Sequence, residues 1–290
     1  MQTQFRIWIL LFIALLSVSS SAIFVRYLAD IEAIPIAFAR MAIAGILLWS
    51  YSIFKPQGSL PLKIKLITLL SGIFLGIHFA FFFSAVKLTT LANATLFGTL
   101  APIFTVLLNY IFYKTKINLK VFIGLILTFL GGLIMQGFDI QISSDSFKGD
   151  ISAVICSFWM ALVLIITKNV RNNFGTIIYS RFLYISAATA LLLLIFILDI
   201  PVKQPNQQEI VFLLLLGFIP NILGHSIFYY SIRFLPAHTI ASIPLGEPII
   251  VSILGLILFK EIVPLSVIFG GIVVILGLFF ILKNSEINED

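Results

Sequence analysis

The chain has 290 residues, of which 60% are hydrophobic and only 10% are charged, and its formal net charge is +6. No soluble domain of this length hides so much apolar surface, because much of any folded surface faces water. The basic residues lie in short gaps between apolar runs, so they do not indicate nucleic-acid binding. The composition therefore predicts an integral membrane protein.

Apolar runs of membrane-spanning length follow one another along the whole chain. Each is close to the roughly 20 residues that a hydrocarbon core of about 30 Å requires, and in lipid a helix satisfies its own backbone. We therefore predict an all-α polytopic protein with ten transmembrane helices at about 7–28, 34–54, 66–86, 91–111, 118–137, 150–167, 176–198, 210–232, 238–259 and 264–282. The first run resembles a signal peptide, but its apolar stretch continues to spanning length.

Lysine and arginine residues predict the orientation. With a cytoplasmic N-terminus, 11 of the 18 basic residues fall in inside segments, 5 fall in outside loops and 2 lie within spans. The excess of inside charge predicts that both termini are cytoplasmic.

Two segments of the chain, 80–133 and 226–279, align without a gap at an offset of 146 residues. The matched pairs include Pro102 with Pro248, Lys114 with Lys260, Gly124 with Gly270 and Gly131 with Gly277. Five helices in each half place the halves in opposite orientations, as in secondary transporters built from inverted repeats. We predict a first repeat at 1–139, a second at 149–284 and a polar tail at 285–290.

Several short motifs resemble the EamA-type branch of the drug/metabolite transporter superfamily. They are LGIHFAFFF at 75–83, LANAT at 91–95 with Ala101-Pro102 after it, GEPI at 246–249 with Phe259-Lys260-Glu261 after it, the segment 35–40, and Gly149-Asp150. The resemblance covers nearly the whole chain. It implies a multi-pass carrier of the bacterial inner membrane that exports amino acids, other metabolites or drugs by alternating access. One departure is Thr115, the repeat equivalent of Glu261, where the family often has an acid.

Glu247 is the first candidate for a transport residue. A carboxylate within a span costs several kcal/mol, so it faces a cavity or a partner. The flanking Pro244 and Pro248, and Pro102 in the first half, are expected to break their helices. Glu247 is interpreted as a coupling site for protons or cations, or as a contact for a substrate amine. The alternative is a structural ion pair with an arginine.

Two arginines and two histidines within spans are further candidates. Arg40 and Arg181 occupy equivalent places in the two halves, and each is interpreted as a contact for a substrate carboxylate or as a snorkelling or capping residue. His78 and His225 precede aromatic runs and suit either proton coupling or plain packing. Other polar or aromatic residues expected to line a cavity, or to bond between helices, are Ser20, Ser21, Asn93, Trp159, Tyr179, Asn221 and Tyr229.

We therefore predict a secondary active or facilitative transporter, most simply an exporter of a small metabolite such as an amino acid, with a central site between helices 1–4 and 6–9. An importer or exchanger of nucleobases, sugars or drug-like compounds is the alternative. A channel or a membrane-embedded enzyme is disfavoured, because the sequence lacks charge rings and the usual catalytic and metal motifs. The expected partners are a small-molecule substrate and the lipid bilayer, without a cofactor or metal; proton coupling and a homodimer, through the paired glycines, are left open.

Overall fold

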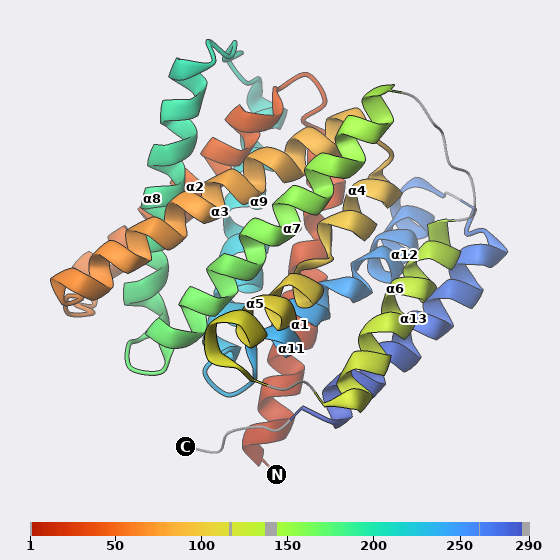
Figure 1. The fold of residues 1–290 in the computed structure, drawn as a ribbon. Helices are drawn as coiled ribbons and strands as arrows, with labels where there is room; N and C mark the ends of the chain where they lie inside the picture. Colours follow the sequence, from red (N-terminus) through yellow and green to blue (C-terminus); the bar gives the residue numbers. More distant parts are fainter. Residues whose placement is uncertain (1, 116–117, 137–143, 261, 286–290) are drawn as a thin grey trace.

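The computed structural model describes residues 2–115, 118–136, 144–260 and 262–285 (Figure 1). The described part of the first half contains α1 (Gln2–Arg26), α2 (Ala33–Phe54), α3 (Leu62–Leu88), α4 (Leu91–Gly98), α5 (Ala101–Tyr113) and α6 (Leu119–Gln136). The second half contains α7 (Ser144–Arg171), α8 (Thr176–Ile197), α9 (Gln207–Phe218), the π-helix η1 (Ile219–His225), α10 (Ser226–Ser231), α11 (Ala237–Ser242), the 3-10 helix η2 (Ile243–Gly246), α12 (Glu247–Phe259) and α13 (Leu265–Lys283).

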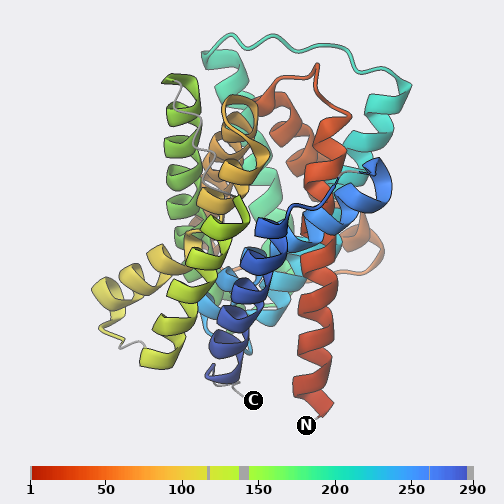
Figure 2. The ribbon, with the colours of Figure 1, turned by 90° about the vertical axis from the view of Figure 1, so that its right-hand side faces the viewer.

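The helices pack into one bundle that mixes the two halves of the sequence. α2 lies against α8, α3 against both α7 and α8, and α6 against α13 (Figures 1 and 2). α1 runs between the halves and contacts η1, α12 and α10. α1 begins and α13 ends at the same end of the bundle, which we call the termini end (Figure 2). The opposite end, which holds the turn at 27–32 and the connection at 198–206, is called the α1–α2 end.

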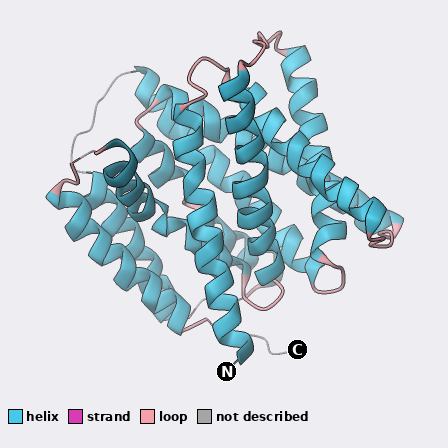
Figure 3. Ribbon diagram, turned by 180° about the vertical axis from the view of Figure 1, so that it is seen from behind, coloured by secondary structure: helices cyan, strands magenta, loops and turns pink. Residues whose placement is uncertain are grey.

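The described residues form helices and loops without a strand (Figure 3), which confirms an all-helical polytopic protein. Within those residues, nine helical segments are long and apolar enough to cross a membrane. The predicted helix at 118–137 is α6, whose apolar stretch in the described part, Leu119–Met135, is shorter than the others. The count of ten and the orientation therefore stay predictions. The helix predicted at 150–167 is longer than expected, because polar residues from Ser144 continue α7 beyond its apolar run.

Three predicted spans are interrupted helices. The span at 91–111 consists of α4 and α5, separated at 99–100 directly before Pro102. The span at 238–259 consists of α11, η2 and α12, with Pro244 inside η2 and Pro248 in the first turn of α12. The span at 210–232 carries the π-helix η1, which begins at Ile219 and Pro220. Because proline lacks an N–H and clashes with the preceding turn, each interruption follows from the sequence.

Two helix ends repeat the same backbone conformation at the 146-residue offset. Lys114 ends α5 and Lys260 ends α12, and both adopt a left-handed conformation with φ of 55°. Non-glycine residues rarely adopt this conformation. The correspondence supports structural equivalence of α5 and α12. Glu261, which follows Lys260, and the last five residues of the predicted polar tail lie outside the described residues.

The paired glycines join the two halves through α6 and α13. A Cβ atom on Gly270 would lie 2.5 Å from both the Gly131 carbonyl oxygen and the Met135 nitrogen, and a Cβ atom on Gly124 would lie 2.8 Å from the Gly277 carbonyl oxygen. The two backbones are therefore in direct contact, as small residues allow between membrane helices. In this chain the glycines serve packing within one molecule.

Gly270→Ala is expected to destabilise the protein by about 1–3 kcal/mol, because the new methyl group would push two backbones apart. The measurement is the melting temperature of detergent-purified protein. Gly271→Ala is the matched control, since its Cβ atom would meet only the Ile249 side chain at 3.6 Å. Equal melting temperatures for the two variants would contradict the proposed backbone contact.

Candidate substrate site

A cavity of about 80 Å³ lies inside the bundle and is lined by residues of α1–α5, α7, η1, α10, α11, η2 and α12. Its polar lining residues are Ser21, Arg40, His78, Thr95, Thr99, His225, Tyr229 and Glu247. Its apolar walls include Phe79, Phe82, Phe228, Met160 and Leu164. Since one water needs roughly 10–15 Å³ of such space, the cavity has room for a small polar group and several waters.

Arg40 extends from α2 into the cavity and is 1% exposed. Its Nε donates a hydrogen bond of 2.6 Å to Asn221 Oδ1, and its Nη1 lies 3.4 Å from Ser21 Oγ. The guanidinium lies over the Phe79 ring, 4.3 Å from the centroid. Nη2 is buried and has no hydrogen-bond partner in the described chain. Buried donors in native proteins are nearly always bonded, so Nη2 is available to a ligand or to water in the cavity.

Glu247 reaches the same cavity from the opposite sequence half. It is the first residue of α12, directly after the 3-10 segment η2, so the helix interruption aims its side chain inward. Of the described residues, none forms an ion pair with Glu247, and Arg40 in particular is beyond ion-pair distance. The structure therefore places a cation and an anion on one cavity without joining them.

The two histidines border this pair of charges. His78 Nδ1 lies 2.8 Å from the Cys156 carbonyl oxygen, and because a carbonyl only accepts, Nδ1 carries the proton and Nε2 is the free acceptor. His225 makes edge-to-face contacts with Phe79 and Phe228, with ring centroids 5.5 and 6.1 Å apart. The Tyr229 hydroxyl is buried without a partner among the described residues. These side chains complete a polar surface around Arg40 and Glu247.

Other predicted site residues lie away from this cavity. Arg181, the predicted repeat equivalent of Arg40, lies over the Trp49 ring at 4.5 Å and donates from Nη2 to the Gly58 carbonyl oxygen at 2.6 Å. Asn93 Nδ2 donates to both oxygens of Asp150. These contacts favour a structural role for Arg181 and Asn93 in this conformation.

The remaining predicted residues are also engaged elsewhere. The Tyr179 hydroxyl bonds to the hydroxyls of Ser71 and Thr167 at 3.1 and 2.7 Å. Trp159 packs against Phe74, with ring centroids 5.1 Å apart. Ser20 Oγ donates to a backbone carbonyl oxygen of its own helix. Pro102 and Pro248 shape their helices without lining the cavity, whereas Pro244 lines it.

Ser21 and Asn221, two further polar residues named from the sequence, also belong to this region. Ser21 lines the cavity in place of its neighbour Ser20. Asn221 is fully buried and bonds to Arg40. Its signal in the sequence is an amide directly after Pro220 within an apolar span, where an isolated polar group needs a partner.

The two ends of the bundle differ in the volume of empty space that lies next to the central cavity. A second cavity of about 460 Å³ opens beside α5 and α7, lined by Asn109, Tyr113, Lys168 and His238 among others. Leu164 and Ile240 line the central cavity, whereas their neighbours Ile165 and Ala237 line this one, so a thin apolar layer separates the two. Toward the α1–α2 end, only about 10 Å³ of space adjoins Glu247.

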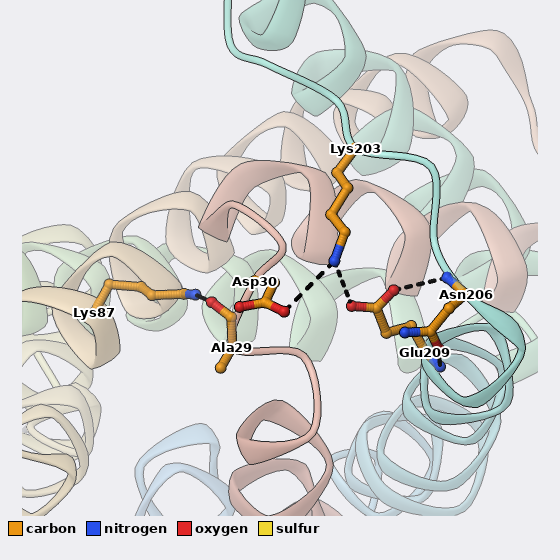
Figure 4. A network of polar contacts seen from close by, with 6 residues as sticks. All are labelled: Ala29, Asp30, Lys87, Lys203, Asn206 and Glu209. Carbon is orange, nitrogen blue, oxygen red and sulfur yellow. Dashed lines mark hydrogen bonds and ion pairs between the residues drawn. The ribbon is translucent and has the colours of Figure 1, made fainter.

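The α1–α2 end is held together by a lysine between two acids (Figure 4). Lys203 Nζ lies 3.5 Å from Asp30 Oδ2 and 3.0 Å from Glu209 Oε1. The hydrogen bond to Glu209 raises the pKa of Lys203, which keeps the ammonium charged. On the other side of the turn, Lys87 Nζ donates to the Ala29 carbonyl oxygen at 2.6 Å. The turn at 27–32 is thereby tied to both halves of the chain.

The capping box of α9 fixes the acid in this contact. Asn206 Oδ1 accepts from the Glu209 N–H at 2.9 Å, and Glu209 Oε2 accepts from the Asn206 N–H at 2.7 Å (Figure 4). Tyr27 stacks on Phe212 one turn further along α9, with ring centroids 4.2 Å apart. We call Asp30, Lys203 and Glu209 the outer clamp.

Comparison with known proteins identifies the family. The model of the EamA-like transporter family matches residues 6–136 and 147–283. The chain belongs to the EamA-like transporter family. An uncharacterized transporter of Archaeoglobus fulgidus is 24% identical over 282 residues, covering 93% of this chain and 95% of its own length. An uncharacterized transporter of Methanothermobacter thermautotrophicus is 25% identical over 212 residues, covering 68% of this chain and 58% of its own length.

The fold also occurs in a solved structure. One crystal structure of a protein matches with a TM-score of 0.78 at 17% sequence identity, covering 95% of this chain and 97% of that chain. At this identity the likeness concerns the fold alone. For this EamA-like protein, the family therefore establishes transport across a membrane as the coarse function, and substrate and mechanism rest on the geometry of the site.

Proposed function

We propose that this EamA-like protein is a secondary carrier that exports a small zwitterionic metabolite, such as an amino acid, through the central cavity. The observation that carries the proposal is the unpaired placement of Arg40 and Glu247 on one cavity. Isolated charges within a membrane span are costly. A ligand that carries one ammonium and one carboxylate would compensate both, the ammonium at Glu247 and the carboxylate at Arg40.

The walls of the cavity indicate the rest of the ligand. Phe79, Phe82, Phe228 and Met160 offer an apolar surface to a side chain. The Tyr229 hydroxyl offers one more polar contact. At about 80 Å³ the cavity is smaller than the roughly 300–1,000 Å³ of open ligand pockets. The proposal therefore includes a widening of the site when substrate enters.

Alternating access is proposed as the mechanism. Two repeats of opposite orientation would move relative to each other about the interrupted helices, opening the cavity to each end in turn. The thin layer toward the termini end and the outer clamp at the other end support a conformation closed outside and nearly open inside. The proposal includes cytoplasmic termini, the plasma membrane of a bacterium as the location, and export as the direction, which the resemblance to EamA-type exporters implies. Proton coupling through Glu247 or a histidine would drive it; a facilitative carrier needs no such step.

Nucleobase, sugar or drug-like substrates form the second candidate class. A neutral sugar would leave both charges uncompensated, which disfavours it. A thermal-shift screen of purified protein against the twenty amino acids, nucleobases and hexoses distinguishes the classes. We expect stabilisation by amino acids with apolar side chains, followed by counterflow of the same compounds in proteoliposomes. Stabilisation by sugars or nucleobases alone would overturn the zwitterion proposal.

Lys203→Met is expected to open the α1–α2 end more often, because it removes the cation of the outer clamp. An ion pair near the surface contributes little on its own, so we expect the population of the open state to rise only a few-fold. The measurement is the labelling rate of Val86→Cys, beside the small space next to Glu247, by an impermeant maleimide in a Cys156→Ala background.

Lys148→Met is the matched control for this prediction. Lys148 forms an ion pair of 3.2 Å with Asp145 at the same end, but both residues belong to α7, so the pair joins no two elements. It should leave the labelling rate unchanged. A similar increase in both variants would mean that the outer clamp does not close this end.

A further inference from the structure

Asn221 holds both the side chain and the backbone of Arg40. Its Oδ1 accepts from Arg40 Nε at 2.6 Å, and its Nδ2 donates to the Arg40 carbonyl oxygen at 2.9 Å. The two bonds define the orientation of the amide, because a flipped amide would set N–H groups against Nε and an oxygen against a carbonyl. One side chain thus ties η1 to α2 at a single residue.

The backbone of Asn221 is itself held in place by its neighbours. It is fully buried, follows Pro220 in η1, and its carbonyl oxygen accepts from the Tyr184 hydroxyl at 3.0 Å. The Ser226 N–H also bonds to this carbonyl oxygen, as the wider turn of a π-helix allows. π-helical turns inside α-helices occur frequently at functional sites. The amide therefore has a fixed position relative to the cavity.

The contact to Nε decides which edge of the guanidinium a ligand can reach. A carboxylate can bind a guanidinium along the edge that includes Nε or at the end formed by Nη1 and Nη2. Because Asn221 already bonds to Nε, only the end formed by Nη1 and Nη2 remains for a ligand carboxylate. There Nη2 is without a partner in the described chain, and Nη1 has only the long contact of 3.4 Å to Ser21. The Phe79 ring packs against the face of the Arg40 guanidinium.

We propose that Asn221 is a positioning residue that makes Arg40 selective for a carboxylate, by presenting Nη1 and Nη2 to the cavity beside Ser21. This inference rests on the proposed function. A carboxylate would accept two parallel hydrogen bonds from the presented end, whereas a carboxamide carries one acceptor oxygen and sets its NH₂ group against a donor. The site should therefore distinguish an amino acid from its amide, which keeps the ammonium and the side chain.

The experiment measures affinity by thermal shift for L-leucine, L-phenylalanine and their amides. The intact protein should bind each acid more tightly than its amide, and Asn221→Ala should reduce this ratio about tenfold, the usual effect of a hydrogen bond to a charged group. Asn221→Asp, nearly identical in shape, serves if the alanine variant does not fold. Its carboxylate neutralises Arg40 and should reduce the ratio at least as much.

Tyr184→Phe is the matched control, since it removes a hydrogen bond to the Asn221 backbone and leaves both bonds to Arg40 in place. It should leave the acid-to-amide ratio unchanged. Equal losses of affinity for acid and amide in the Asn221 variants would overturn the positioning role while leaving the zwitterion carrier intact. Absence of binding of all twenty amino acids to the intact protein would overturn the proposed function, and this inference with it.

Discussion

Glu247→Gln is expected to reduce amino-acid counterflow in proteoliposomes by about 10- to 100-fold. A hydrogen bond to a charged group contributes about 1.5–3 kcal/mol, and glutamine keeps the shape of the side chain while removing its charge. The substrate ammonium would then face a neutral amide. Counterflow of L-leucine into vesicles preloaded with L-leucine measures this step without a proton gradient.

The same variant tests proton coupling when accumulation is measured against an imposed pH gradient. Arg40, His78, His225 and Tyr229 also face the cavity, so a histidine could carry the proton in place of Glu247. If pH-driven accumulation is lost while counterflow is retained, Glu247 carries the coupling proton but does not bind the substrate. Unchanged counterflow and unchanged pH dependence together would remove Glu247 from the transport mechanism.

Glu32→Gln is the control for the loss of one negative charge. Glu32 is exposed at the start of α2, its side chain makes no capping hydrogen bond, and it lies outside the cavity lining. It should leave counterflow and pH dependence as they are. Equal protein yield and melting temperature for both glutamine variants would show that a loss at Glu247 concerns transport.

The sequence could predict the apolar spans and the helix breaks at Pro102, Pro244 and Pro248, but not the π-helix η1, because apolar length and proline act locally. Apolar length predicts a span, and proline predicts a break wherever the helix needs an N–H. The same reasoning predicted that Glu247 either faces a cavity or pairs with an arginine, since an acid in lipid must face a cavity or find a partner. The prediction that the helix at 150–167 is short was wrong, because polar residues at a helix end do not stop helix formation.

The site itself depended on contacts that spacing does not determine. Arg40 and Arg181 are predicted to be equivalent, yet Arg181 bonds to a carbonyl oxygen, lies over the Trp49 ring and does not line the cavity. Ser20 and Ser21 differ by about 100° around their helix, and only the packing of α1 decides which one faces inward. Asn221 is visible in the sequence as a polar residue within an apolar span, but its two bonds to Arg40 arise within the π-helix η1, which the sequence does not predict.

Arg40→Met is expected to invert the preference of the site, from amino acids to their amides. Without the guanidinium, Glu247 is the one formal charge left among the described residues that line the cavity, and a ligand carboxylate would lie in an apolar site near another carboxylate. Affinity for L-leucine should fall by about 100-fold or more, whereas affinity for leucinamide should change little. Thermal shift measures both compounds on the same preparation. Parallel losses for both would indicate a structural role for Arg40.

Arg40→Lys separates charge from shape. Lysine keeps the positive charge but lacks the planar pair of donors, so it should retain part of the affinity for L-leucine and lose much of the discrimination against the amide. Combining Asn221→Ala with Arg40→Met gives the decisive comparison. If Asn221 acts only through Arg40, the double variant should have the same acid-to-amide ratio as Arg40→Met alone. A further change in the ratio would mean that Asn221 reaches the substrate by a route independent of the arginine.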